Sequence, residues 1–150
     1  MYENNAAEEC FEWIRLGMWT WFVTLKYPRE GSPKHKGPRA SSAEEAFASW
    51  SNELLLNTKE WCVAYVRATE IREDGDVLFH VLLRGVPSEQ EESWRWRWFD
   101  ISAGAAWGRT LNAGIERLFK YLFHKVHCDI ECYAVGDIKV YRADENTRRE

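Results

Sequence analysis

The sequence predicts an α+β fold, in which a ferredoxin-like antiparallel sheet carries helices packed mainly on one face. Two observations favour this class. Segments with strand and helix periodicity follow one another in the order strand, helix, strand, strand, strand, helix, strand. Their connections are short, and a tight reversal at Asp74-Gly75 joins two of the strands as a hairpin, which favours antiparallel pairing.

The first half of the chain predicts an extension, a strand, a basic loop and a helix. Residues 1–18 mix acidic and apolar side chains as a short helix does, and residues 19–27 are rich in aromatic and β-branched side chains, which favour a strand that Pro28 ends. Residues 28–39 combine Pro, Gly and basic residues, as loops do. Ser41 and Ser42 each precede a Glu by three positions, a capping-box spacing, so we expect a helix over 42–56.

The second half predicts further strands, a helix and a final hairpin. Residues 61–71 and 77–84 are strand-like, and the latter is apolar on both faces, as central strands are. An acidic loop (86–93), a strand in which aromatic residues alternate with Arg (94–101) and a Gly- and Ala-rich turn (102–108) follow. A helix begins near residue 110, strands 131–135 and 138–141 form the hairpin, and the tail 142–150 is expected to fray.

Length and composition indicate a single domain over 1–150. The chain has 150 residues, of which 45% are hydrophobic, so disorder is not expected as its main state. No apolar run approaches the roughly 18 residues of a membrane helix and no signal peptide is found, so we expect a cytoplasmic protein with no membrane partner. The net charge of −4 disfavours a general nucleic-acid coat but leaves a local basic groove open.

The nine Trp residues allow two interpretations, a large core or a platform for unstacked bases. On the predicted strand 94–101, Trp94, Trp96 and Trp98 share one face, which we expect to close the core, and Arg95 and Arg97 share the other. Candidate contacts to a DNA backbone are the basic residues of this strand and of the preceding loop: Arg95, Arg97, Lys34, Lys36 and Arg39.

Glu70 and His80 form a candidate metal site if the hairpin register brings them together. A three-residue loop places Glu70 opposite His80, whereas a two-residue loop places Thr69 there and turns Glu70 to the other face. A carboxylate beside an imidazole is a partial site for Mg²⁺ or Mn²⁺. The alternative is a buried, hydrogen-bonded histidine of the core.

Tyr121 lies on a polar face of the predicted helix. At about 100° per residue, Arg117, Lys120, Tyr121 and His124 cluster together, nearly opposite the apolar stripe. Such a cationic setting favours a phenolate or a nearby phosphate. The alternative is an ordinary solvent-exposed tyrosine.

The cysteines allow a zinc site only weakly. Cys128 and Cys132 lie near His124 and His127, but the spacing is not that of a zinc finger. Ordinary thiols in a reducing compartment are the expected alternative.

Three blocks, in order, resemble the rolling-circle replication initiators of the HUH endonuclease superfamily, found in plasmids, phages and small viruses. WFVTLKYP (21–28) resembles the first motif. EIREDGDVLFHVLL (70–83) resembles the second, which carries an acid and a His-hydrophobic-His triplet. LFKYLFHK (118–125) resembles the third, the helix of the nucleophilic tyrosine.

The resemblance implies an enzyme that nicks single-stranded or hairpin DNA by tyrosine attack. Tyr121 matches the nucleophile, Lys125 or less directly Lys120 the accompanying lysine, and Glu70 and His80 match ligands of Mg²⁺ or Mn²⁺. Arg117 is a further DNA-binding candidate, and any unwinding would need host replication proteins, because no helicase domain is present.

This chain departs from the pattern at two positions. Leu78 replaces the first His of the triplet, and Arg117 stands where a second tyrosine would pair with Tyr121. A non-catalytic single-stranded or hairpin DNA-binding protein is therefore the alternative, and a small structural or interaction domain is a third hypothesis.

Overall fold

The computed structural model describes residues 2–59 and 62–143, and within them it shows a six-stranded antiparallel sheet and four α-helices. The strand order is β4-β1-β3-β2-β5-β6. The strands are β1 (Trp21–Tyr27), β2 (Ala64–Ile71), β3 (Val77–Arg84), β4 (Ala106–Arg109), β5 (Asp129–Ala134) and β6 (Asp137–Tyr141). The helices are α1 (Tyr2–Leu16), α2 (Ala43–Asn57), α3 (Glu91–Ser102) and α4 (Ile115–His124), with a short 3₁₀ turn η2 (Ser88–Gln90) before α3.

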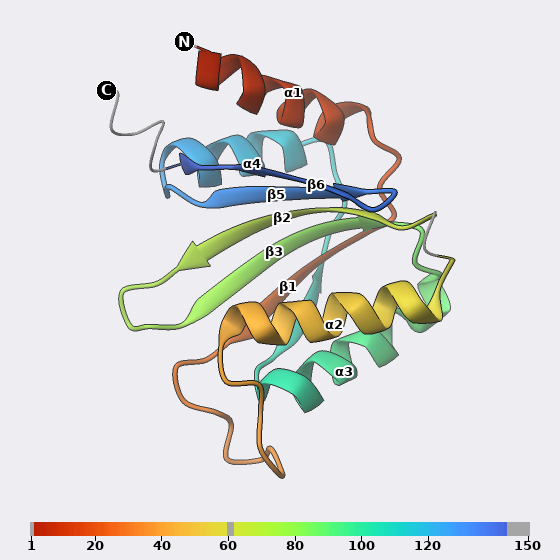
Figure 1. The fold of residues 1–150 in the computed structure, drawn as a ribbon, viewed down its shortest axis with the longest axis vertical. Coiled ribbons are helices and arrows are strands. Elements are labelled where there is room, and N and C mark those ends of the chain that lie inside the picture. The colour runs from red at the N-terminus through yellow and green to blue at the C-terminus, as the bar shows by residue number, and fades with distance from the viewer. Residues whose placement is uncertain (1, 60–61, 144–150) are drawn as a thin grey trace.

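The predicted α+β class and its ferredoxin-like sheet are confirmed. The segment β1-α2-β2-β3-α3-β4 folds into the strand order β4-β1-β3-β2, with α2 and α3 on the same face. The chain then adds α4, β5 and β6, which extend the sheet beyond β2 (Figure 1).

The prediction that helices cover mainly one face is wrong, because they cover both (Figure 1). One face of the sheet packs with α2 and α3 around Trp50, Phe79 and Trp98. The other packs with α1 and α4 around Phe11, Leu82 and Phe119. The physical reason is that β3 is apolar on both faces, and such a strand is stable only where both faces are covered.

Several predicted elements are confirmed. β3 has the predicted bounds, and α1 lies within the predicted N-terminal extension. The final hairpin forms as predicted, although its turn, at Val135-Gly136, comes one residue before the expected Gly136-Asp137. Ser42 caps α2, because its hydroxyl accepts a hydrogen bond from the backbone N–H of Glu45. In the predicted frayed tail, residues 144–150 lie outside the described residues.

The segment 94–101 was predicted as a strand and is instead part of helix α3. Trp94 and Trp98, four residues apart, share one side of the helix and pack edge-to-face on Trp50. Trp96 points away from them and is 63% exposed, so the three Trp do not share a face. Tertiary packing of Trp94 and Trp98 against α2 overrides the aromatic alternation that favoured a strand.

Two further boundaries differ from the prediction. The turn expected over 102–108 contains the short edge strand β4, which pairs with β1. The helix expected from residue 110 begins at Ile115 as α4, so Leu111 is not on its apolar stripe.

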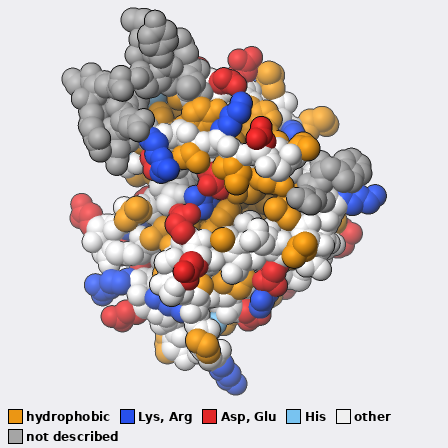
Figure 2. Space-filling model, in the orientation of Figure 1, with side chains coloured by type: hydrophobic (Ala, Val, Ile, Leu, Met, Phe, Trp, Pro, Cys, Tyr) orange, Lys and Arg blue, Asp and Glu red, His pale blue; other side chains and the backbone are white. Residues whose placement is uncertain are grey.

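At the opposite edge of the sheet, β6 leaves apolar side chains in solvent. Ile138 and Val140 are 56% and 42% exposed. Figure 2 shows hydrophobic side chains gathered in the middle of this face of the molecule, between the two helix layers.

Candidate active site

The sheet face beneath α4 carries a row of polar side chains in an otherwise apolar surface. Directly opposed residues of antiparallel strands share a face, and the register aligns Ala68, His80, Thr24 and Trp107 across β2, β3, β1 and β4. Ala68 belongs to the hydrophobic cluster that includes Phe119 of α4. His80 therefore lies on the same side of the sheet as the helix that carries Tyr121.

The hairpin has neither of the two predicted registers. Residues 72–76 form the connection, closed by a hydrogen bond from the Arg72 N–H to the Asp76 carbonyl, and Gly75 takes the positive φ of 97° that favours glycine. Glu70 pairs with Leu78, and Ala68 pairs with His80. Because Glu70 is two residues from Ala68, it keeps the same face, and its Oε1 lies 2.9 Å from His80 Nε2. The predicted contact thus forms diagonally.

Both ring nitrogens of His80 have partners. Its Nδ1 lies 3.2 Å from the Thr24 hydroxyl, and that hydroxyl oxygen accepts a hydrogen bond from Arg109 Nη1, also at 3.2 Å. The Thr24 proton is then free to point at Nδ1, which leaves the ring proton on Nε2 to be donated to Glu70. The network orients the imidazole and, with no metal bound, favours the tautomer that is protonated on Nε2.

Burial sets the charge of His80. The side chain is buried, and this desolvation lowers its pKa, although the Glu70 carboxylate acts in the opposite direction. His80 is therefore neutral at pH 7, the form that ligates metal ions.

Glu70 and His80 fit two positions of a metal site but not a complete one. Ligands at about 2.1 Å on adjacent corners of an octahedron are about 3 Å apart, which is the spacing of Glu70 Oε1 and His80 Nε2. Leu78 is buried directly opposite Glu70 on the same face and offers no donor atom. Within residues 2–59 and 62–143, no cluster of three or more His, Cys, Asp or Glu side chains could hold a metal ion. Any Mg²⁺ or Mn²⁺ here would take its other ligands from phosphate and water.

Tyr121 is exposed on α4, which confirms that it is not part of the core. Its side chain is 57% exposed, whereas Phe119, Leu122 and Phe123 are buried. Leu118, one turn earlier, lines a hollow with Phe22 and Arg109. Residues three apart share a helix flank, so Tyr121 stands on the flank that faces β1, β4 and the Arg109–Thr24–His80 network. No hydrogen bond or ion pair of the described residues joins Tyr121 to Glu70 or His80.

The two candidate lysines lie on different sides of α4. Lys120 pairs with Glu116 at 3.1 Å and lies over the Phe11 ring of α1. Lys125, at the C-cap, is four residues from Tyr121 and exposed, as is Arg117, four residues before it. Lys125 and Arg117 thus flank Tyr121, and Lys120 is turned towards α1.

The other basic candidates lie on the opposite face of the molecule. Two of them, Arg39 and Arg97, are bound to other groups of the protein. Arg39 donates hydrogen bonds to the carbonyls of Pro28, Arg29 and Ser102. Arg97 binds the Glu53 carboxylate through Nε and Nη2. Lys34, Lys36 and Arg95 make no ion pair within the described residues.

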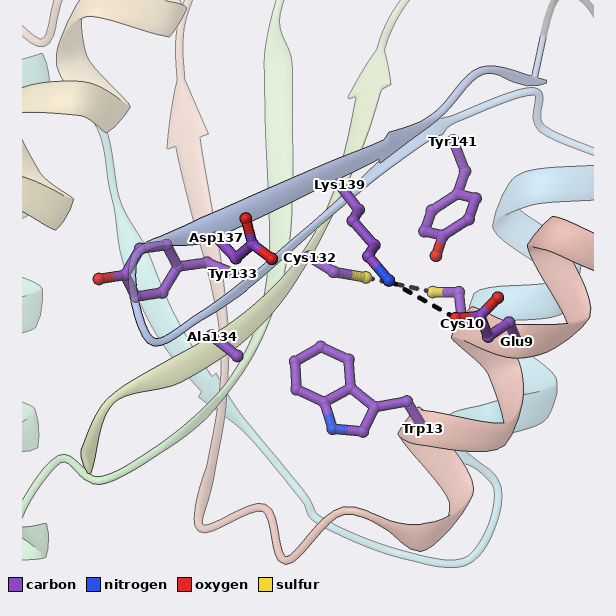
Figure 3. Close-up of a pocket in the computed structure, with 9 residues that line it drawn as sticks. All are labelled: Glu9, Cys10, Trp13, Cys132, Tyr133, Ala134, Asp137, Lys139 and Tyr141. Atoms are coloured by element: carbon purple, nitrogen blue, oxygen red, sulfur yellow. Dashed lines mark hydrogen bonds and ion pairs between the residues drawn. The ribbon is translucent and has the colours of Figure 1, made fainter. Parts of the chain in front are cut away.

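Among the cysteines of the described residues, Cys128 is the one whose thiol lies near enough to Glu70 to be affected by its charge. Cys10 Sγ and Cys132 Sγ lie 3.3 Å apart beside a pocket between α1, β5 and β6 (Figure 3). Burial raises the pKa of the Cys128 thiol to about 12, and the nearby charge of Glu70 adds to this shift. The zinc alternative would need a cluster of Cys128, Cys132, His124 and His127, and no such group that could hold a metal ion forms among the described residues.

Sequence reasoning missed Thr24 and Arg109. Thr24 offered a signal, since it is the one polar residue at the centre of an apolar strand. Arg109 offered none, because β4 itself was unexpected.

Comparison of the chain with protein-family models, with curated proteins and with solved structures finds no match. Among the helices of the described residues, none combines the length and apolar character needed to cross a bilayer.

Proposed function

We propose that this protein is a replication initiator that nicks single-stranded DNA through Tyr121 and so starts rolling-circle replication in the cytoplasm. The observation that supports this most is the 2.9 Å contact of Glu70 with His80 on the sheet face toward which the Tyr121 flank of α4 is turned. The substrate would be single-stranded or hairpin DNA, with host replication proteins as partners for unwinding.

The proposed step is a transesterification. The Tyr121 Oη attacks the phosphorus of a phosphodiester, forms a bond to the 5′-phosphate, and breaks the bond to the 3′-oxygen. The phenol proton leaves to solvent and the departing 3′-oxygen takes up a proton. Arg117 and Lys125 would favour the phenolate and the phosphate.

The Glu70–His80 pair and its neighbours would orient the scissile phosphate. Glu70 and neutral His80 would hold a divalent metal, which, when bound, polarises a phosphate oxygen. Arg109 and Thr24 would keep the His80 ring in place, as outer partners of metal ligands do.

Leu78 favours a second candidate, a non-catalytic DNA-binding protein on the same fold. Its side chain is 6% exposed and occupies the position from which a third ligand would reach the metal. Both nitrogens of His80 are also satisfied without a metal.

A covalent-adduct assay separates the two candidates. The protein is incubated with Mn²⁺ and labelled single-stranded and hairpin oligonucleotides of randomised sequence, then run on a denaturing gel. The proposal predicts a labelled protein band that Tyr121→Phe abolishes and that the matched variant Tyr141→Phe retains. Tight binding without any adduct would contradict nicking and leave the binder.

A further inference from the structure

An open hollow lies on the face opposite to His80, between the basic loop, α3 and the start of β4. It has a volume of about 620 Å³ and is lined by Lys34, Glu92, Arg95, Trp96, Phe99, Ala105 and Ala106. Its lining combines two aromatic side chains with two cations and a single acid, Glu92.

Trp96 is the unusual member of this hollow. It is 63% exposed, whereas its helix neighbours Trp94 and Trp98 are buried. A large indole held in solvent is an informative exception, because aromatic side chains gain stability from burial.

The aromatic wall is fixed rather than loose. Phe99 packs edge-to-face on Trp96 on one side and on His35 on the other, with ring centroids 6.2 Å and 5.3 Å apart. His35 Nε2 in turn lies 2.8 Å from the Asp100 carbonyl, and the Ser32 N–H donates to the Ala103 carbonyl. These contacts pin the basic loop to the end of α3, and so they position Lys34 beside Trp96.

The two cations are available to a ligand. Lys34 is exposed and Arg95 is half-buried. Within the described residues neither has an acid at ion-pair distance, and the acid that Arg95 acts on is Glu91, one turn earlier on α3. This differs from Arg97 on the same helix, which Glu53 neutralises.

The hollow borders the edge strand β4, and the next residue of that strand faces the candidate active site. Ala106 lines the hollow. Trp107, the next residue, points to the other face of the sheet, where it is paired with Thr24. Trp107 is 38% exposed. A strand of DNA that crosses this edge would therefore meet Trp96 on one face, and Trp107 with the His80 row on the other.

We propose that the hollow is a second binding site for single-stranded DNA, in which a base stacks on Trp96 and the flanking phosphates bind Lys34 and Arg95. Exposed aromatics beside unpaired cations are the chemistry that holds unpaired strands. The proposal rests on the proposed DNA function but not on cleavage.

Binding of a fluorescent oligo(dT) to the full chain, followed by anisotropy, tests this site. Trp96→Ala should weaken binding about tenfold, the order that loss of one base–aromatic stack produces, and Trp96→Phe should recover most of it. Replacing Lys34 and Arg95 by Gln should flatten the dependence of log affinity on log salt by about 1.4, at about 0.7 for each lost phosphate contact. Leu56→Ala, which removes an apolar side chain that is 84% exposed on α2, is the control and should bind like the wild type.

Unchanged binding of Trp96→Ala would overturn the second site, and so would failure of the wild type to bind oligo(dT). The adduct assay on the same variants distinguishes the two proposals. An adduct that persists while Trp96→Ala binds like the wild type refutes only the second site. Loss of binding in Trp96→Ala, with no adduct in the wild type, supports the second site and refutes only nicking.

Discussion

His80 is the residue on which the candidate active site depends. It is buried, hydrogen-bonded on both ring nitrogens, and kept neutral by desolvation. The sequence predicted its partner Glu70 but not the register, because residue counts cannot show where a turn closes. In the structure Ala68, not Glu70, pairs with His80. Because Ala68 and Glu70 are two residues apart, Glu70 still lies on the same face as His80, and the contact forms.

The lowered pKa of His80 predicts a pH dependence of stability. In the unfolded chain the imidazole binds a proton below about pH 6.5, whereas in the folded protein it resists protonation. The free energy of unfolding contributed by His80 is therefore present above about pH 6.5 and is lost as the pH falls towards the lower, folded pKa. Urea unfolding at several pH values should show this loss. In His80→Gln, the free energy of unfolding should fall less steeply with decreasing pH. Equal slopes for both proteins would contradict the buried, neutral imidazole.

Leu78 predicts a gain of metal affinity on a single change. Because it lies opposite Glu70 and beside His80 on one face, Leu78→His would add a third donor. We expect Leu78→His to bind Mn²⁺ at least about tenfold more tightly, the order by which metal-site changes alter affinity. Calorimetric titration measures it, with Leu78→Met as a volume-matched control that adds no hard ligand. No difference between the two variants would mean that these positions do not converge on one ion.

At the scale of elements, α3 shows where local pattern and tertiary packing conflict. The alternation of Trp and Arg in residues 94–98 is typical of a strand, but the same spacing also places Trp94 and Trp98 on one side of a helix. α2 was predicted correctly because its capping serine and its apolar spacing both indicate a helix. Where two periodicities fit, the contact with Trp50 decides, and this contact is not visible in the local sequence.

Because α3 is a helix, we expect the loss of Trp98 to destabilise the fold strongly and the loss of Trp96 to have almost no effect. Trp98→Ala should lower the free energy of unfolding by about 3–5 kcal/mol, because it leaves a cavity in the core. Trp96→Ala should change it by less than about 0.5 kcal/mol, because its side chain is in solvent. Urea unfolding of both variants measures this difference, and similar losses at the two positions would favour the strand instead.

At the scale of the whole molecule, the sheet separates two surfaces. One carries the Glu70–His80–Thr24 network beneath α4, and the other carries Trp96 and the basic loop beside α3. The ferredoxin-like part, β1 to β4 with α2 and α3, could be expected because short connections and the hairpin turn at Asp74-Gly75 are visible in the sequence. The covering of the second face had a signal in the two-sided apolar strand β3, but the choice of α1 and α4 as its cover depends on long-range packing.

The central proposal is that Tyr121 forms a covalent bond to DNA. The most direct test is peptide mapping by mass spectrometry after incubation with Mn²⁺ and single-stranded oligonucleotides. We predict a phosphonucleotide on the peptide that contains Tyr121, and its loss in Glu70→Gln, which removes the carboxylate charge at similar size. A modification on another residue, or none in a protein that binds the same DNA tightly, would contradict the claim.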